Sequence, residues 1–320
     1  MPRVSIAIRA FRRRWLSEAI ASVLAQTHRD LELVIYDDAG DLEPVAAGFG
    51  DPRVRYHRAE ARLTASGRFA AAAAQCRGEY IGILDDDDRY DPTFVATLVQ
   101  VLDSDPRCGV AFCRSVWDDA GELVVPRDPR PAGPQADYVE SMLRHGWWTA
   151  FSQMLIRRSA LEAAFRDQPL PPDVGPDTFI NLRIGLAGWT HVLVDGLLSR
   201  RRWHAGQLTR EFPVADDMAI ATFRRLAIAD GILASVRDQQ LARSHLVRAV
   251  HALRAGDVGQ ARVDVAAAAS LAPSAWRAER RALALAVAGG PAGILAARLW
   301  AACSPRGRRR SRAPDRVGHR

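Results

Sequence analysis

The amino-terminal part of the chain alternates short apolar runs with helical patterns, and this alternation constrains the fold more than any other feature. Apolar runs predict strands at Val4–Ile8, Leu31–Tyr36, Val54–His57, Tyr80–Leu84 and Val110–Trp117. Between them, helical periodicity or alanine-rich composition predicts helices at Trp15–Leu24, Phe69–Cys76 and Thr93–Leu102. Because strands separated by helices pair through parallel crossovers, the pattern predicts an α/β fold with a mostly parallel sheet flanked by helices.

Four consecutive aspartates, Asp85, Asp86, Asp87 and Asp88, directly follow the apolar run Tyr80–Leu84. Open α/β sheets bind ligands at the carboxyl ends of their strands. Carboxylates this close raise one another's pKa, which a divalent cation would relieve. Oxygen ligands suit Mg2+ or Mn2+, ions that bridge substrate phosphates. The alternative is a solvated acidic loop in which an aspartate caps the next helix.

Polar residues also follow the other predicted strands, Asp37-Asp38 after Leu31–Tyr36 being the clearest case. Since parallel strands end at one edge of a sheet, we expect these groups to line a ligand cleft. Residues 124–134 form a proline-rich loop, and the pattern beyond it predicts a less regular second half. This half contains Trp147-Trp148, Met154-Leu155-Ile156 and a predicted helix at Thr178–Ala187.

The formal charge of +7 is concentrated in the tail: residues 306–320 hold seven arginines against one aspartate and supply +6. The rest of the chain is close to neutral, so the basic composition does not indicate a nucleic-acid binder. The 320 residues leave room for one large α/β domain and an appendage.

All basic residues other than histidine are arginine. The absence of lysine excludes Schiff-base chemistry and the lysine-containing phosphate loop, and leaves arginine to bind phosphate bidentately. The four cysteines lack metal spacing, and the chain enters a strand at once without an apolar leader. These features predict a reduced, cytoplasmic protein.

After Pro213 the pattern is helical throughout. Gly256, Ala261 and Pro273 have the spacing of one tetratricopeptide-like unit, which predicts a helical hairpin packed on the α/β body. The apolar segment Ala282–Cys303 is too interrupted to span a membrane. With the basic tail, it predicts an interfacial helix on an anionic membrane surface or, alternatively, a buried hairpin followed by a disordered tail. We therefore expect domains at 1–212 and 213–303, and a disordered tail at 304–320.

Several strings of residues form a recognisable set: Val4-Ser5-Ile6, Glu18-Ala19-Ile20, Ser22-Val23-Leu24-Ala25-Gln26-Thr27, Asp37-Asp38 and Arg77-Gly78-Glu79-Tyr80-Ile81 with the aspartates that follow. This set resembles the family-2 inverting glycosyltransferases, which have the GT-A fold. Arg68, before an alanine-rich helix, also matches. The resemblance covers roughly residues 3–210.

The resemblance implies a nucleotide site at four positions. Asp38 would accept the imide N–H of uracil or thymine, Phe11 would lie against the base, Arg68 would contact the nucleotide and Asp86 the ribose. It also implies a metal ligand at Asp87, supported by Asp85 and Asp88.

The resemblance implies a catalytic base at Asp177, before the Thr178–Ala187 helix, with a helix N-cap as the alternative. In Arg202-Trp203-His204 the histidine would reach the metal or the diphosphate; the alternative is a surface-loop histidine.

The chain departs from the family pattern in two places. Arg9-Ala10-Phe11-Arg12 stands where the family usually has Pro-Thr-Tyr-Asn, so Arg9 or Arg12 is a candidate contact for the phosphates or for an acidic donor sugar. Pro176-Asp177 replaces a Glu-Asp pair, which leaves one carboxylate. In the second half, Trp147 and Trp148 either stack on a sugar face or fill the core.

Together these features predict an inverting, Mg2+- or Mn2+-dependent glycosyltransferase that uses a UDP- or TDP-sugar donor. Its acceptor would be a hydroxyl of a saccharide or lipid-linked molecule, in cell-surface polysaccharide or glycoconjugate synthesis. The alternatives are a catalytically degenerate scaffold or binding protein and a nucleotidyltransferase. We expect a cytoplasmic protein with peripheral contact to the inner membrane face through the C-terminal helix and tail.

Overall fold

The computed structural model describes residues 1–11, 13–38, 40–126, 128–146, 149–204, 207, 212–229 and 231–288. These residues form two compact units. The first unit comprises Met1–Met142 and Gly146–His204, and the second comprises Leu143–His145 and the described residues after His204.

Across the described part of the first unit, ten strands form one mixed sheet in the order β3-β2-β1-β4-β9-β6-β10-β5, with β7 on β6 and β8 on β10. The strands are β1 (Val4–Ala10), β2 (Leu31–Asp37), β3 (Val54–Arg58), β4 (Tyr80–Asp85), β5 (Arg89–Tyr90), β6 (Cys108–Asp119), β7 (Glu122–Val124), β8 (Gly133–Pro134), β9 (Met154–Arg157) and β10 (Thr190–Trp203). Strands β3, β2, β1 and β4 pair in parallel, as β6 does with β10, whereas β9 runs antiparallel between β4 and β6.

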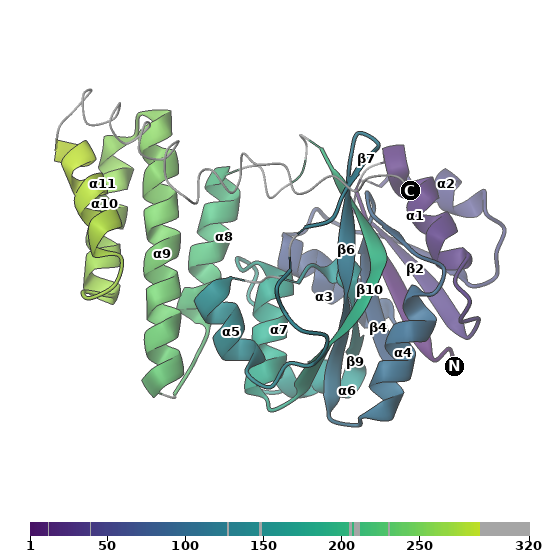
Figure 1. Cartoon of the computed structure of the whole chain (residues 1–320). Coiled ribbons are helices and arrows are strands. Elements are labelled where there is room, and N and C mark those ends of the chain that lie inside the picture. Colours follow the sequence, from purple (N-terminus) through teal and green to yellow (C-terminus); the bar gives the residue numbers. More distant parts are fainter. Residues whose placement is uncertain are drawn as a thin grey trace. The chain divides into compact units, whose positions relative to one another are not determined.

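Helices cover both faces of this sheet (Figure 1). The helices are α1 (Arg13–Leu24), α2 (Glu43–Ala47), α3 (Ala65–Gln75), α4 (Phe94–Ser104), α5 (Tyr138–His145), α6 (Arg158–Ala164) and α7 (Pro176–Leu186), with a 3-10 turn η1 at Phe151–Gln153. The apolar stripes of α1 and α4 pack with alternate residues of β1 and β2 in one core. Since helices shield both faces, β2 is buried along its whole length.

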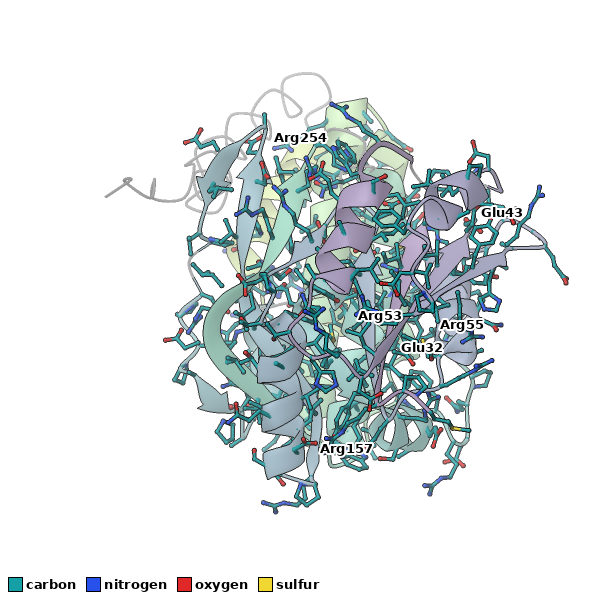
Figure 2. The ribbon with its side chains drawn as sticks, turned by 90° about the vertical axis from the view of Figure 1, so that its right-hand side faces the viewer. Glu32, Glu43, Arg53, Arg55, Arg157 and Arg254 are labelled. Carbon is teal, nitrogen blue, oxygen red and sulfur yellow. The ribbon has the colours of Figure 1, made fainter. Side chains whose placement is uncertain are left out.

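At the amino-terminal ends of β1 and β2, a network of hydrogen bonds surrounds the buried Glu32. Ser5 donates its hydroxyl proton to Glu32 at 2.6 Å, and Arg55 pairs with the same carboxylate at 2.9 Å; Figure 2 labels Glu32 and Arg55. Burial alone would raise the pKa of Glu32, but these hydrogen bonds and one from the Arg77 backbone lower it. Beside them, a Cβ on Gly78 would lie 2.6 Å from the Ser5 backbone nitrogen, so only glycine fits.

The second unit is helical, with α8 (Phe212–Arg225), α9 (Gly231–Ala255), α10 (Val258–Leu271) and α11 (Arg277–Ala288). Helices α9 and α10 form a hairpin whose turn contains Gly256 at φ +85°, a conformation that favours glycine. Buried Ala249, Leu253 and Ala261 pack between them. The expected helical C-terminal region is therefore confirmed, while its packing on the α/β body stays a prediction.

The apolar segment Ala282–Cys303 lies partly, and the tail 304–320 wholly, outside the described residues. Within the described ranges, the helices are all too short or too polar to cross a membrane.

The α/β prediction is confirmed, with strand and helix ends shifted by a few residues. The strand β10, however, was not predicted. Its outer half contains Arg200-Arg201-Arg202 and is only partly buried, so it lacks the apolar run by which strands are recognised.

Candidate active site

The carboxyl ends of three neighbouring strands bring the predicted residues together. Strand β1 lies between β2 and β4, with Ala10 in register with Asp37 and Arg9 in register with Asp85. Phe11, Asp38 and Asp86 each follow directly at the same edge. This is the edge at which open α/β sheets bind ligands.

Asp38, Arg68 and Phe11 form one cluster. The Asp38 side chain is fully buried, and its Oδ2 accepts from Arg68 Nη1 at 2.9 Å. The Phe11 ring is 38% exposed, and the guanidinium groups of Arg62 and Arg68 lie 5.2 and 6.0 Å from its centre. The three residues, all expected to contact the nucleotide, are thus gathered, and Arg62 joins them without having been predicted.

Asp37 has a different role from its neighbour Asp38. Its carboxylate accepts from the Tyr56 hydroxyl at 2.6 Å and from the backbone nitrogens of Gly40 and Leu42 at 2.7 and 2.9 Å. These bonds fix the loop that follows β2. The second aspartate of the pair is therefore the one held towards Arg68.

The first two members of the aspartate run face β1. Asp85 pairs with Arg9, whose guanidinium lies 4.8 Å from the centre of the Phe151 ring. Asp86 is buried, and its Oδ2 accepts from the backbone nitrogen of Phe11 at 2.6 Å. Asp86 thereby fixes the backbone that carries the exposed aromatic ring.

The last two members face the end of β10. Asp87 Oδ2 lies 2.8 Å from His204 Nε2. Asp88 accepts from the Arg202 backbone nitrogen at 2.9 Å, and Arg201 Nε lies 3.9 Å from its other oxygen. Burial, together with the charges of Asp87 and Asp85, raises the pKa of Asp88 to about 8 although Arg201 opposes the shift. The mutual repulsion expected from the sequence is present at this carboxyl.

The donor set at Asp87 and His204 suits a divalent cation that is shared with a substrate. Throughout the described ranges, the structure contains no group of three or more His, Cys, Asp or Glu side chains arranged to hold a metal. Mg2+ commonly uses one or two protein ligands together with substrate phosphates and water. The carboxylate and imidazole that converge here fit that mode.

His204 is held by residues to which the sequence analysis assigned no role. Its ring lies 4.6 Å from that of Trp15, and the Arg202 guanidinium lies 5.0 Å from the same indole. Arg202 also pairs with Glu18 at 2.8 Å and donates to the Asp87 carbonyl at 3.2 Å. Helix α1 therefore positions the end of β10 against the aspartate turn.

Asp177 lies in the first turn of α7, but it is not the N-cap. Gly175 occupies that position, and Asp177 Oδ1 accepts from the next backbone nitrogen, that of Thr178, at 2.8 Å. The residue is half-buried, and its desolvation raises its pKa, although the Thr178 hydrogen bond and the charges of Arg9 and Arg201 oppose the change. Asp177 thus lies within electrostatic range of the aspartate run.

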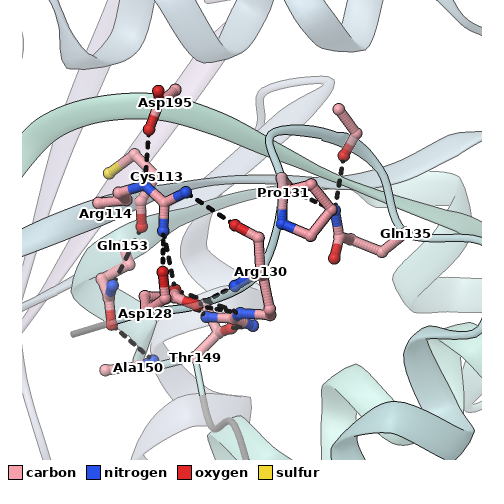
Figure 3. A network of polar contacts seen from close by, with 11 residues as sticks. Cys113, Arg114, Asp128, Arg130, Pro131, Gln135, Thr149, Ala150, Gln153 and Asp195 are labelled. Atoms are coloured by element: carbon pink, nitrogen blue, oxygen red, sulfur yellow. Dashed lines mark hydrogen bonds and ion pairs between the residues drawn. The ribbon is translucent and has the colours of Figure 1, made fainter.

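A network of hydrogen bonds beside β6 fixes the segment between Thr149 and Gln153 (Figure 3). Gln153 donates to the Cys113 carbonyl at 3.0 Å, and the Thr149 hydroxyl lies 3.4 Å from an Arg130 nitrogen. Between them, the Ser152 hydroxyl accepts from the Asp85 backbone nitrogen at 3.2 Å. The network therefore holds the segment whose Ser152 contacts the start of the aspartate run.

Three predicted contact residues, Arg12, Trp147 and Trp148, lie outside the described residues.

Comparison with known proteins identifies the family. The model of glycosyl transferase family 2 matches residues 5–165, half of the chain, so the protein belongs to that family. An uncharacterised glycosyltransferase of Nostoc sp. is 28% identical over 169 residues, which are 49% of this chain and 51% of the relative. Another, of Rickettsia felis, is 34% identical over 106 residues, 32% of this chain and 17% of the relative.

Two solved structures share the GT-A fold. S. aureus TarS, in complex with UDP-GlcNAc, superposes with a TM-score of 0.62 at 13% identity, covering 92% of this chain and 89% of that one. The mannosyltransferase PcManGT of Pyrobaculum calidifontis, in complex with GDP-Man and Mn2+, gives 0.57 at 18% identity, covering 93% and 86%. The predicted fold class is confirmed.

Proposed function

We propose that the protein is an inverting, metal-dependent glycosyltransferase that moves a sugar from a nucleotide-diphosphate donor to a hydroxyl group of a saccharide or lipid-linked acceptor. The observation that carries this proposal is the convergence of three groups of residues at one sheet edge. They are the Asp38–Arg68 pair beside Phe11, the Asp87–His204 pair, and Asp177 near Arg9 and Arg201.

Asp177 is the group proposed to accept the proton of the acceptor hydroxyl. Its burial raises its pKa, so its carboxylate is a stronger base than an exposed aspartate. Its backbone is held by the first turn of α7, and Ser66 of α3 donates to the carbonyl of Val174 just before that helix at 3.0 Å. A base held in this way takes the proton from an acceptor oxygen that attacks the anomeric carbon from the side opposite the departing diphosphate, as inversion requires.

The nucleotide and its diphosphate are assigned to the other residues of the site. Asp38 is proposed to accept the base imide, Phe11 to lie against the ring, and Asp86 to contact the ribose. Asp87 and His204 would hold Mg2+ or Mn2+, which when bound supplies charge to stabilise the leaving diphosphate. Arg68 adds a fixed cation on the nucleotide side.

The donor class rests on chemistry and on the similar proteins. A carboxylate that accepts an imide N–H suits a uracil or thymine nucleotide, which favours UDP- or TDP-sugars. TarS was solved with UDP-GlcNAc and PcManGT with GDP-Man and Mn2+, so a guanine donor is the alternative to test. We place the reaction in cell-surface polysaccharide or glycoconjugate synthesis at the cytoplasmic face of the membrane, with the basic tail as the membrane contact.

A thermal-shift and calorimetric screen tests this proposal. UDP-, TDP- and GDP-sugars are titrated with and without Mn2+, and at least one is expected to stabilise the protein by about 2.7 kcal/mol at a hundred times its Kd. Asp87→Asn is expected to lose the Mn2+ dependence, whereas the matched control Asp257→Asn, at the N-cap of α10, keeps it. Failure of every nucleotide to bind would overturn the proposal and favour a scaffold role.

A further inference from the structure

Two tryptophans stack at the outer ends of β6 and β10. The rings of Trp117 and Trp203 are 5.2 Å apart and nearly parallel, with an interplanar angle of 8°. Trp203 is 37% exposed and Trp117 is partly exposed. Exposed aromatic side chains beside polar groups, at the ligand-binding edge of a sheet, are typical of a ligand-binding surface.

The strand register places this pair on the same face of the sheet as Arg201. Arg201 is in register with Trp117, and Trp203 follows Arg201 by two residues. Arg202 lies on the opposite face, where it contacts Trp15 and Glu18 of α1. The tryptophans therefore face away from α1 and from the imidazole of His204, which also packs on Trp15.

Arg201 connects the pair to the proposed reaction centre. Its Nε lies 3.9 Å from Asp88 and, among the described residues, has no hydrogen-bond partner. Its charge also acts on the carboxyl of Asp177. The aromatic pair thus lies beside a cation that is close to the aspartate run and acts on the proposed base.

We propose that Trp117 and Trp203 form the acceptor subsite and bind the pyranose ring of a saccharide by stacking. This inference rests on the proposed function. The C–H face of a pyranose is flat and apolar, whereas its hydroxyl groups lie at the rim and need polar partners. The surface has that arrangement, because the charged Arg201 and the exposed Asp119, which is in register with Trp203, flank the indole rings.

The test compares Trp203→Leu, which keeps an apolar contact with Trp117, with Trp203→Phe, which keeps an aromatic face. Tryptophan fluorescence of the full chain, with the donor nucleotide and Mn2+ present, is titrated with maltose, cellobiose and diacetylchitobiose. Trp203→Leu is expected to weaken saccharide binding by roughly three- to tenfold, the range of a stacking contact, while Trp203→Phe restores most of it. Trp189→Phe, just before the other end of β10, is the matched control and should bind as the wild type does.

Nucleotide affinity is measured on the same variants and is expected to stay unchanged. This separates the two proposals, because a wild-type protein that binds no nucleotide would contradict the glycosyltransferase function itself. The subsite is overturned if the nucleotide binds but none of the three saccharides changes the fluorescence. It is also overturned if Trp203→Leu binds saccharide as tightly as the wild type.

Discussion

The two units each contain an aspartate–histidine pair with arginine nearby, yet the surroundings differ. In the sheet unit, Asp87 lies 2.8 Å from His204 at the strand-end edge. In the helical unit, Asp264 of α10 lies 2.6 Å from His245 of α9 in a fully buried position. The same two side-chain types therefore occur both beside a candidate ligand site and inside a helix interface.

The carboxyl groups around the two pairs have pKa values that are shifted in opposite directions. Burial alone would raise the pKa of Asp264, but hydrogen bonds from His245, Arg248 and Gln260 lower it to about 2. At the sheet edge, Asp88 and Asp177 are also desolvated, and their partners leave both pKa values raised. A buried carboxylate whose hydrogen bonds lower its pKa indicates a structural role. Neighbouring carboxyl groups whose pKa values stay raised indicate a ligand site.

The largest effect is expected from Asp264→Ala. Removing this carboxylate takes away the partner of the buried His245 and one of the two carboxylates that pair with the partly buried Arg248, which should cost about 3–5 kcal/mol of unfolding free energy. Urea unfolding followed by circular dichroism measures the loss. Asp257→Ala, at the exposed N-cap of the same helix, is the control and should cost about 1 kcal/mol. Equal losses in the two variants would show that the buried network is not the stronger contact.

A smaller effect is expected at the matching aspartate of the sheet unit. Asp87→Ala should lower transfer by about two to three orders of magnitude, because the diphosphate loses charge stabilisation. Its unfolding free energy should change little, because the group serves a ligand more than the fold. Steady-state kinetics and urea unfolding on one preparation provide both numbers. A variant that unfolds as easily as Asp264→Ala but retains transfer would reverse the comparison.

The two classes of carboxyl should also differ in the sign of their pH dependence. Asp264 has a lowered folded-state pKa, so its contribution is complete above its unfolded pKa of 3.8 and is lost as the pH falls towards about 2. Acid titration of wild type and Asp264→Asn measures this, and the two curves are expected to converge at low pH. Parallel curves down to that range would contradict the assigned shift.

The smallest effect is a gain in stability. Asp177 has a raised folded-state pKa, so its contribution falls as the pH rises from its unfolded value through its folded one. Asp177→Asn removes the desolvated charge and should raise stability at neutral pH by about 1 kcal/mol, as at functional sites whose residues are not optimised for stability. A thermal melt in which Asp177→Asn is less stable than the wild type would argue for a structural role.

The sequence predicted the parts of the fold that depend on local patterns. Apolar runs located β1, β2, β4 and β6, and the family resemblance selected Asp38, Arg68, Asp87 and Asp177 as site residues. The strand β10 was missed because its arginine-rich outer half packs only partly. The pairing of Arg9 with Asp85 and of Trp117 with Trp203 was also missed, since each joins residues far apart in the chain.

The four aspartates show why neighbouring identical residues could not be separated in advance. Asp85 and Asp86 bond to the end of β1, whereas Asp87 and Asp88 bond to the end of β10. The turn that divides them is closed by a 3.1 Å bond from the Asp88 nitrogen to the Asp85 carbonyl, and no local pattern in four equal residues encodes it. Only the strands on either side distinguish them.

The most direct test of the account is the transfer rate of Asp177→Asn against its donor affinity. Transfer should fall by about 10²- to 10⁴-fold, the contribution of a general base, while calorimetry shows donor and Mn2+ binding equal to that of the wild type. Full transfer activity in Asp177→Asn, with donor binding intact, would contradict the assignment of the base and with it the proposed mechanism.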